Sequence, residues 1–268
     1  MDQRLDTSGM GKLLVKLLID CDYIVYKSCA ATETEMDFGD DVIVVTSDFT
    51  EAMKCTERAL KKIKDEFGNF SEMILFFSSP NNFRKKIFPL YKGSRLRKKP
   101  CGYKRVIREL ENRYKVIKMP QLEADDALGI YSVNNPGNII VSPDKDMRQI
   151  PGQLYDFKET TTITAEEGAK WHALQLTAGD NTDGYTGIPG FGLKKATQLF
   201  DNNGYSWKTV VDAYADKGLD ETEALLNARL AKILTPEDYD EKEGEPILWT
   251  PTTDHIFDGR TRSAVAVN

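Results

Sequence analysis

Apolar and polar residues follow one another along this chain in blocks that predict strands and helices in turn. Short apolar runs at residues 13–19, 73–77 and 138–141 have the length of buried strands, and the first run ends at Asp20. Residues 48–67 carry an apolar residue or a threonine every three to four positions and stop at Gly68, which predicts an amphipathic helix. Another helix is predicted to begin at Glu123. Strands that alternate with helices favour an α/β fold with a mostly parallel sheet.

The pattern changes toward the C-terminus. From Trp171 onward it is mainly helical, and after about Pro251 little periodicity is left. We expect this last stretch to dock as an irregular extension or to stay partly disordered. The 268 residues, 40% of them apolar, suffice for one sizeable core with a smaller lobe beside it.

Several classes of protein are disfavoured by composition. The chain has no run of about 18 apolar residues, so no membrane span is predicted. Its first eleven residues are polar and mixed in charge, unlike a secretory signal. The four cysteines form no Cys-x-x-Cys pair and have no histidine at zinc-finger spacing, which favours reduced thiols. We therefore expect a cytoplasmic protein.

The distribution of charge changes what the net charge suggests. A net charge of −6 and a pI of 5.2 argue against a nucleic-acid partner. Between Arg84 and Lys118, however, fourteen lysines and arginines are opposed by two glutamates. Such a run is often only a solvated surface. On an otherwise acidic chain it also fits a polyanion held against carboxylates that bind metal.

Carboxylates gather in four short clusters. Two clusters directly follow apolar strands, whose carboxyl ends meet at one edge of a parallel sheet. Each cluster alone fits a turn or a helix cap. Together they would repel one another unless divalent cations lay between them, and oxygen-only ligands favour Mg²⁺ or Mn²⁺. The clusters are Asp20 and Asp22; Glu123, Asp125 and Asp126; Asp144 and Asp146; and Asp180 and Asp183.

A glycine-rich turn follows the last acidic pair. Gly190 and Gly192 allow a tight turn at the start of a helix, where backbone N–H groups bind phosphate and Lys194 and Lys195 add positive charge. Similar turns also connect helices without any ligand. The combination with Gly-Asp-x-x-Asp at residues 179–183 is more specific and predicts a contact with DNA.

These motifs resemble those of the 5′-nuclease (flap endonuclease, PIN-like) superfamily. They are Leu-Glu-Ala-Asp-Asp at residues 122–126, Ser-Pro-Asp-Lys-Asp at 142–146 and Gly-Asp-Asn-Thr-Asp-Gly-Tyr at 179–185. Tyr-Lys-Gly-Ser-Arg at 91–95 is similar to the Tyr-Lys-Gly-Asn-Arg of phage and bacterial members. The run at 98–103 resembles the 5′→3′ exonucleases of short-tailed phages in particular. The resemblance covers about residues 14–200, with a weaker echo at 230–234.

The resemblance implies an organisation and a set of site residues. It implies a nuclease core at residues 1–175 that includes a basic helical arch at about 80–120, a helix–three-turn–helix DNA-binding lobe with further helices at 176–250, and a tail at 251–268. Lys92 and Arg95 would be catalytic, acting on the scissile phosphate. One metal ion would belong to Asp20, Glu123, Asp125 and Asp126, and a second to Asp144, Asp146, Asp180 and Asp183, some of them through water. DNA would be contacted by Tyr91, Lys98, Lys99, Gly190, Gly192, Lys194 and Lys195.

The activity implied is 5′→3′ exonuclease and flap endonuclease cleavage of DNA in phage replication, by a two-metal mechanism. The cofactor would be two Mg²⁺ ions, replaceable by Mn²⁺, with K⁺ held by backbone oxygens at the glycine-rich turn. The partners would be duplex DNA with a free 5′ end or a 5′ flap, and RNA–DNA hybrids, in the host cytoplasm.

Two alternatives stay open at this point. An aspartyl phosphatase of the haloacid dehalogenase type would use Asp20 as nucleophile and Asp22 as general acid, but leaves the basic segment and the glycine-rich turn unexplained. A non-catalytic DNA-binding scaffold is supported only by Ser79, which stands where the family usually has an aspartate and would leave the first metal short of one carboxylate.

Overall fold

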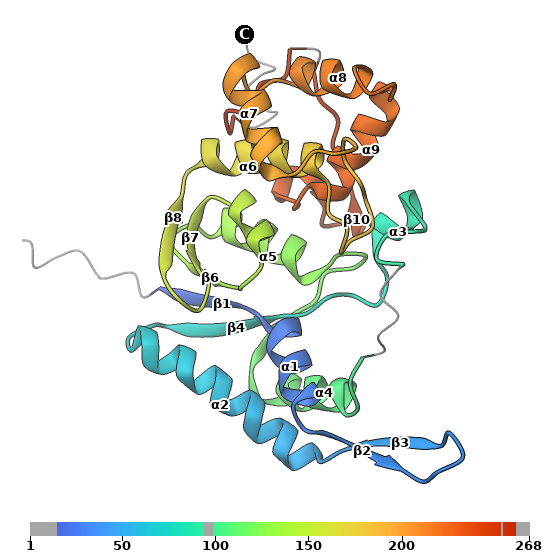
Figure 1. Ribbon diagram of the computed structural model, residues 1–268. Coiled ribbons are helices and arrows are strands. Elements are labelled where there is room, and N and C mark those ends of the chain that lie inside the picture. The colour runs from blue at the N-terminus through green and yellow to red at the C-terminus, as the bar shows by residue number, and fades with distance from the viewer. Residues whose placement is uncertain (1–14, 94–98, 253, 261–268) are drawn as a thin grey trace, which may run out of the picture.

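The computed structural model describes residues 15–93, 99–252 and 254–260, with a six-stranded sheet at the centre (Figure 1). The strand order is β5-β4-β1-β6-β7-β8. Neighbours from β5 to β7 pair in parallel, and β8 is antiparallel at the edge, which confirms the predicted mostly parallel α/β sheet. The strands are β1 (Lys16–Asp20), β4 (Glu72–Phe76), β5 (Lys115–Ile117), β6 (Ile139–Val141), β7 (Gly152–Tyr155) and β8 (Thr160–Ile163).

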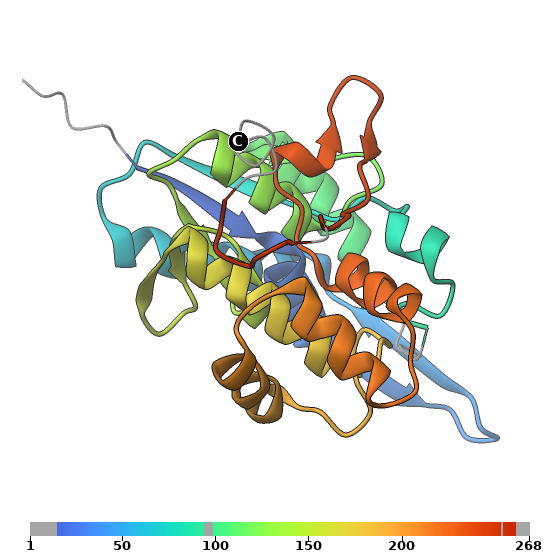
Figure 2. The ribbon, with the colours of Figure 1, turned by 90° about the horizontal axis from the view of Figure 1, so that it is seen from above.

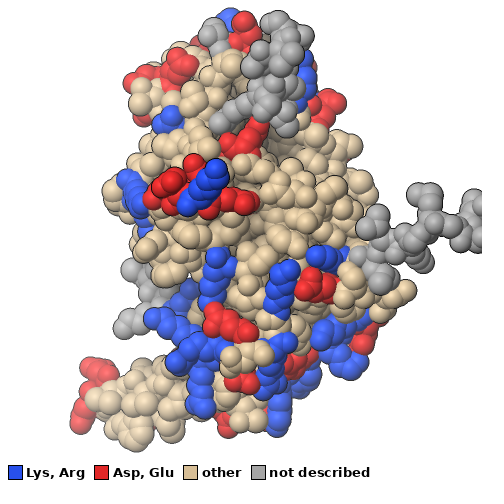
Figure 3. Space-filling view, turned by 180° about the vertical axis from the view of Figure 1, so that it is seen from behind, with Lys and Arg blue, Asp and Glu red and all other residues tan. Residues whose placement is uncertain are grey.

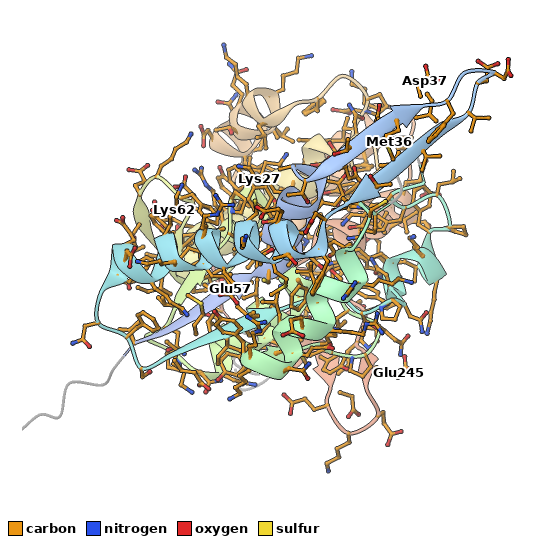
Figure 4. All side chains as sticks on the ribbon, turned by 90° about the horizontal axis from the view of Figure 1, so that it is seen from below. Lys27, Met36, Asp37, Glu57, Lys62 and Glu245 are labelled. Atoms are coloured by element: carbon orange, nitrogen blue, oxygen red, sulfur yellow. The ribbon has the colours of Figure 1, made fainter. Side chains whose placement is uncertain are left out.

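Helices cover both faces of this sheet, which explains why its central strands are apolar at successive positions. Leu17 and Ile19 of β1 face a core shared with α1 (Cys21–Ala30), α2 (Phe49–Phe67) and α4 (Tyr103–Arg113). Figure 4 shows these helices across the lower face. Leu18 faces the opposite core, which contains α5 (Ala124–Asn134). The strand directions bring the ends of β1, β4 and β6 to the same edge.

A second lobe of helices lies above the sheet (Figures 1 and 2). Its members have an apolar core of their own, to which Tyr91 also belongs. Phe257, which belongs to the predicted tail, packs against His172 of this lobe, as does Trp249 just before the tail. The helices are α6 (Ala165–Ala178), α7 (Leu193–Asn203), α8 (Trp207–Ala215) and α9 (Glu221–Ala231).

The predicted elements recur with shifts of a few residues at their ends. The helix predicted at residues 48–67 is α2, whose N-cap Asp48 accepts a hydrogen bond from the Glu51 N–H and whose C-cap Gly68 has a φ of 61°. An antiparallel hairpin of β2 (Glu33–Asp37) and β3 (Ile43–Ser47) was not predicted. It projects from the body of the protein, as the labelled Met36 shows in Figure 4. The smaller elements are α3 (Phe83–Ile87), η1 (Lys145–Gln149), η2 (Pro236–Asp238), β9 (Tyr239–Asp240) and β10 (Glu245–Pro246).

The prediction of a basic arch at about residues 80–120 needs correction. The buried face of α4 belongs to the core beneath the sheet, and β5 pairs with β4, so both are part of the nuclease core. Hydrophobic burial of Val106 and Leu110 fixes α4 there. Its exposed face carries lysines and arginines, and Figure 3 shows basic residues gathered over the lower half of the rear face. Arg84, by contrast, is 1% exposed and contributes nothing to the surface charge.

Over the described ranges, none of the helices is both long and apolar enough to cross a membrane. The four cysteines are free thiols, as predicted.

Candidate active site

A cleft of about 1010 Å³ opens where the carboxyl ends of β1, β4 and β6 meet the start of α5 and the turn after α6. Parallel strands place their C-terminal residues at one edge, which is where open α/β sheets form their sites. Seven of the eight carboxylates predicted as metal ligands line this cleft. They are Asp20, Glu123, Asp125, Asp144, Asp146, Asp180 and Asp183.

Hydrogen bonds and helix caps hold four of these carboxylates in place. Asp20 is the last residue of β1 and accepts a hydrogen bond from the Ser142 hydroxyl at 2.8 Å. Glu123 is the N-cap of α5, and Asp144 caps η1 by accepting the Asp146 N–H at 2.9 Å. Asp180 accepts backbone N–H groups within its own turn after α6. The side chains therefore enter the cleft from elements that are far apart in sequence.

Burial and repulsion between neighbouring carboxylates raise the pKa of several of these groups. Burial, with the charges of Asp22 and Asp144, raises the pKa of Asp20 to about 7 although the Ser142 hydrogen bond lowers it. Burial and then the charges of Asp20, Asp144 and Glu123 raise the pKa of Asp125. Burial and the charge of Asp144 also raise the pKa of Asp146 to about 7. Asp144 thus contributes to all three shifts.

Cationic side chains offset part of this charge. The Lys92 ammonium lies 2.6 Å from Glu123 Oε1 and 3.5 Å from Asp183 Oδ2. Burial alone would raise the pKa of Glu123, but Lys92 and Arg84 bring it down to about 2. Lys145 lies 3.1 Å from Asp180. Lys92 is therefore in the cleft, where a catalytic role was predicted for it.

Asp126 is a correction to the predicted metal ligands. It is fully buried, and both of its oxygens accept hydrogen bonds from Arg84, at 2.7 and 2.8 Å. Asp125 and Asp126 are neighbours on a helix, where adjacent side chains point in different directions. Asp125 therefore faces the cleft, and Asp126 forms a buried ion pair.

Tyr91 is a correction to the predicted DNA contacts. It is 2% exposed, so its ring cannot stack on a base. Its hydroxyl lies 2.9 Å from both Glu123 Oε2 and Asp183 Oδ2 and, with one hydrogen, donates to one of them at a time. The residue orients two carboxylates of the cleft.

The other predicted DNA contacts are spread over two places. Lys99 lines the cleft, with its ammonium 4.4 Å from the centre of the Tyr103 ring. Lys194 and Lys195 are exposed in the first turn of α7, for which Gly192 is the N-cap. Gly190 has a φ of 77°, and its carbonyl accepts from the Lys195 ammonium at 2.8 Å. Arg95 and Lys98 lie outside the described residues.

Ser79 lines the same cleft, as its position after β4 predicts. Its backbone N–H donates to the Leu122 carbonyl at 2.8 Å, which fixes the loop. Asp22 also lines the cleft, but both of its carboxylate oxygens already accept hydrogen bonds. One oxygen accepts the Ser78 N–H at 2.8 Å, and the other accepts the Tyr103 hydroxyl.

Some residues of the site were missed from the sequence. The sequence places Arg84 in a run of basic residues that indicates surface charge, and no local sequence feature distinguishes it from Lys85 and Lys86. Gln149 and Gln175 are buried and connect to Asp146, as described below. A weak signal exists for Gln175, because it is a polar residue between two leucines of a helix.

The donor set fits a hard divalent cation. All of the acidic groups that line the cleft are oxygen ligands, and repulsion among them falls when a cation lies between them. Within the described residues, no three acidic, histidine or cysteine side chains are already arranged as a formed metal-binding group. The individual ligand roles accordingly stay predictions.

Comparison with known proteins agrees with this arrangement. Residues 15–172 match the family model described as 5′-3′ exonuclease, N-terminal resolvase-like domain. The chain is 28% identical to the exodeoxyribonuclease of Enterobacteria phage T3, over 88% of this chain and 92% of the relative. It is 26% identical to the exonuclease of Escherichia phage T7, over 88% and 93%. The flap endonuclease of bacteriophage T5, solved with DNA and metal ions, matches with a TM-score of 0.58 at 14% identity over 83% of this chain and 89% of that chain.

The fold is that of the flap nucleases, a mixed α/β architecture around a mostly parallel sheet. The chain belongs to the 5′-3′ exonuclease family, because the family model covers more than half of it. The phosphatase alternative is not favoured. Its general acid would be Asp22, whose two oxygens both accept hydrogen bonds inside the protein.

The raised pKa values predict how the metal-free protein responds to pH. Asp20 and Asp146 have folded pKa values of about 7 against 3.8 in the unfolded chain, so the folded state binds more protons between about pH 4 and 7. Stability is therefore lost as pH rises through this window. In EDTA, the melting temperature is expected to fall from pH 5 to pH 8, and excess Mg²⁺ is expected to reverse the fall. Asp146→Asn should flatten the slope in EDTA, and an unchanged slope would contradict the assignment.

A second prediction concerns Ser79. Since an added carboxylate favours a hard dication, Ser79→Asp is expected to lower the Mg²⁺ concentration for half-maximal activity several-fold. Titrating Mg²⁺ in single-turnover cleavage measures this midpoint. Combining the change with Asp22→Asn tests whether Asp22 substitutes for the missing ligand. A midpoint that moves in neither variant would place Ser79 outside the metal site.

Proposed function

We propose that this protein is a divalent-metal-dependent 5′→3′ exodeoxyribonuclease that also cuts 5′ flaps. The observation that carries the proposal is the convergence of seven carboxylates and the Lys92 ammonium in one cleft at the edge of the sheet. Relatives named exodeoxyribonuclease and exonuclease align over nearly their whole length, which supports the same reaction here.

The residues divide naturally between two cation positions. Asp20, Glu123 and Asp125 would hold one ion, and Asp144, Asp146, Asp180 and Asp183 would hold the other. Mg²⁺ is proposed, with Mn²⁺ able to replace it. Bound there, such ions would lower the pKa of an attacking water and stabilise the leaving 3′ oxygen of a phosphodiester.

The chain's own groups position the phosphate and balance charge. Lys92 presents its ammonium beside Glu123, where it can offset charge that develops on the phosphate oxygens. The Tyr91 hydroxyl lies within hydrogen-bonding distance of the Glu123 and Asp183 carboxylates and donates to one of them at a time. The low exposure of Lys92, 15% for its side chain, means that little solvent screens its charge.

Duplex DNA is proposed to contact two surfaces. Lys99 lies in the wall of the cleft, where we propose that it contacts a strand entering the cleft. The segment from α6 to α7 is proposed as the helix–three-turn–helix, with the exposed Lys194 and Lys195 and the N-terminus of α7 directed to a phosphate. We further propose a K⁺ at the backbone carbonyls of this turn, and RNA–DNA hybrid as a secondary substrate.

One experiment tests the central proposal. A duplex labelled at one 5′ end is incubated with the protein in Mg²⁺ and, separately, in EDTA, and the products are sized. Short labelled products that form only in Mg²⁺ are expected. Hydrolysis of a small phosphomonoester, with the duplex left intact, would reject the nuclease assignment.

The glycine-rich turn gives a prediction about duplex binding. Gly190 needs its positive φ, which a β-branched residue adopts only with strain. Gly190→Val is therefore expected to weaken duplex binding about tenfold while cleavage of a short single strand stays within about twofold. Gly218→Val, a glycine of similar φ at the end of α8, is the matched control. Unchanged duplex affinity in Gly190→Val would make the turn a simple connector.

A further inference from the structure

The last two residues of α9 and the three residues after it, Leu230 to Leu234, hold polar side chains that connect to carboxylates of the active site. Arg84 donates to the carbonyls of Leu230, at 2.9 Å, and Lys232, at 2.5 Å. Gln149 donates to the Ala231 carbonyl at 2.7 Å and accepts the Ile233 N–H at 3.0 Å. The Leu234 N–H donates to Asp126 at 3.2 Å. Every residue of the segment thus uses a backbone group to hold a buried polar side chain.

The first branch runs through Arg84 to Glu123. Arg84 forms a two-pronged ion pair with Asp126, and Asp126 in turn accepts the backbone N–H of Glu123 at 3.2 Å. The Arg84 guanidinium also lies 3.5 Å from the Glu123 carboxylate. A planar guanidinium that is fixed at four acceptors has little freedom, so it defines where the start of α5 lies.

The second branch runs through two glutamines to Asp146. The Gln149 amide donates to Gln175 Oε1 at 2.6 Å, and the Gln175 amide donates to Asp146 Oδ1 at 2.5 Å. The backbone of Ile233 sets the donor and acceptor order in this series of hydrogen bonds. Because the Ile233 N–H requires an acceptor, the Gln149 oxygen faces it, and the Gln149 NH₂ must then face Gln175. Gln175 consequently presents its own NH₂ to Asp146.

The polar side chains of both branches are buried, so the loss of any one hydrogen bond is costly. Arg84, Asp126, Gln149 and Gln175 are each at most 6% exposed. A buried polar group that loses its partner is costly, so these hydrogen bonds are maintained together. The proposed reaction uses none of the four side chains.

We propose that the segment Leu230–Leu234 is a common support that positions the two groups of carboxylates, Glu123 through Arg84 and Asp126, and Asp146 through Gln149 and Gln175. The four side chains are positioning residues, since they act through the carboxylates that they hold. This inference rests on the proposed nuclease function, because it assigns these carboxylates to the metal site. Residues that orient metal ligands commonly change metal affinity or activity by about 10- to 100-fold.

Gln175→Met is the first test, since methionine has a similar length but cannot donate to Asp146. The matched control is Thr177→Val in the same helix, a fully buried residue whose hydroxyl donates only to the Ala173 carbonyl. Calorimetric titration with Mn²⁺ in the absence of DNA measures metal binding, and steady-state cleavage gives kcat and KM. Gln175→Met is expected to weaken Mn²⁺ binding and to lower kcat by about tenfold each, with KM for DNA within about threefold. Thr177→Val is expected to leave all three values near wild type.

Gln149→Met tests the support itself, because Gln149 touches no carboxylate. It is expected to lower Mn²⁺ affinity and kcat, as Gln175→Met does. The double variant should lose no more affinity or kcat than the more impaired single variant, since both changes interrupt the same series of hydrogen bonds. Arg84→Lys keeps the positive charge but loses the two-pronged geometry of the guanidinium. We again expect a lower kcat with little change in the KM for DNA. Gln149→Met also decides the matter if Gln175→Met fails to fold.

The outcomes separate this inference from the proposed function. If Gln149→Met and Gln175→Met bind Mn²⁺ and turn over like Thr177→Val, the positioning role is wrong and the nuclease proposal stands. A wild-type protein that neither binds Mn²⁺ nor cuts DNA would overturn the proposed function itself.

Discussion

Replacing Asp144 with asparagine is expected to lower DNA cleavage by at least about 100-fold while duplex binding changes by no more than a few-fold. Asp144 lines the cleft, and its charge raises the pKa of Asp20, of Asp125 and of Asp146, so it acts on carboxylates of both groups. The change removes a charge and leaves a side-chain oxygen that can still accept the Asp146 N–H at the start of η1. The loss is therefore expected in chemistry and not in folding.

Single-turnover cleavage and duplex affinity, measured in parallel, check this expectation. Asp156→Asn is the matched control, since Asp156 is an aspartate that caps an exposed turn outside the cleft. It should retain full activity. Cleavage by Asp144→Asn above about a tenth of the wild-type rate would reject the metal role of this residue.

Lys92→Ala is expected to have the second-largest effect, lowering the single-turnover rate about 100-fold or more with much smaller loss of affinity. A contact that forms mainly in the transition state changes the rate of chemistry and leaves ground-state binding nearly intact. The structure adds a second consequence. Lys92 keeps the pKa of Glu123 low, so its removal should also raise that pKa and lower the melting temperature in EDTA at neutral pH.

Lys85→Ala provides the comparison for Lys92. Lys85 is an exposed lysine that lines the same cleft, so its removal tests simple electrostatic steering of DNA. It should weaken binding slightly, more so at low salt, and spare the rate of chemistry. If Lys92→Ala behaves in the same way, Lys92 is only one of several steering charges.

If the proposed positioning role holds, the two branches would give the C-terminal lobe a part in catalysis in addition to its proposed contact with DNA. The segment Leu230–Leu234 comprises the end of α9 of that lobe and the three residues after it, and it forms hydrogen bonds with Arg84 and Gln149, one in each branch. A change in the lobe would therefore reach the metal site through hydrogen bonds and not only through the bound DNA.

The sequence by itself determined the parts of this protein that depend on local patterns. Buried strands need continuous apolar residues, and this need marked β1, β4 and β6 and hence the edge where Asp20 and Asp144 lie. Helical periodicity and Gly68 marked α2 in the same way. The ordered acidic motifs identified the family and seven of the carboxylates in the cleft.

Only the tertiary structure decided which charged and polar residues are buried and against what. Arg84 looks like its neighbours Lys85 and Lys86 in the sequence, but it meets Asp126, 42 positions away, and the Leu230 carbonyl, 146 positions away. The same packing turned Asp126 away from the cleft and enclosed Tyr91. A buried polar group is stable only when distant segments supply its partners, and no local pattern records where those segments will meet.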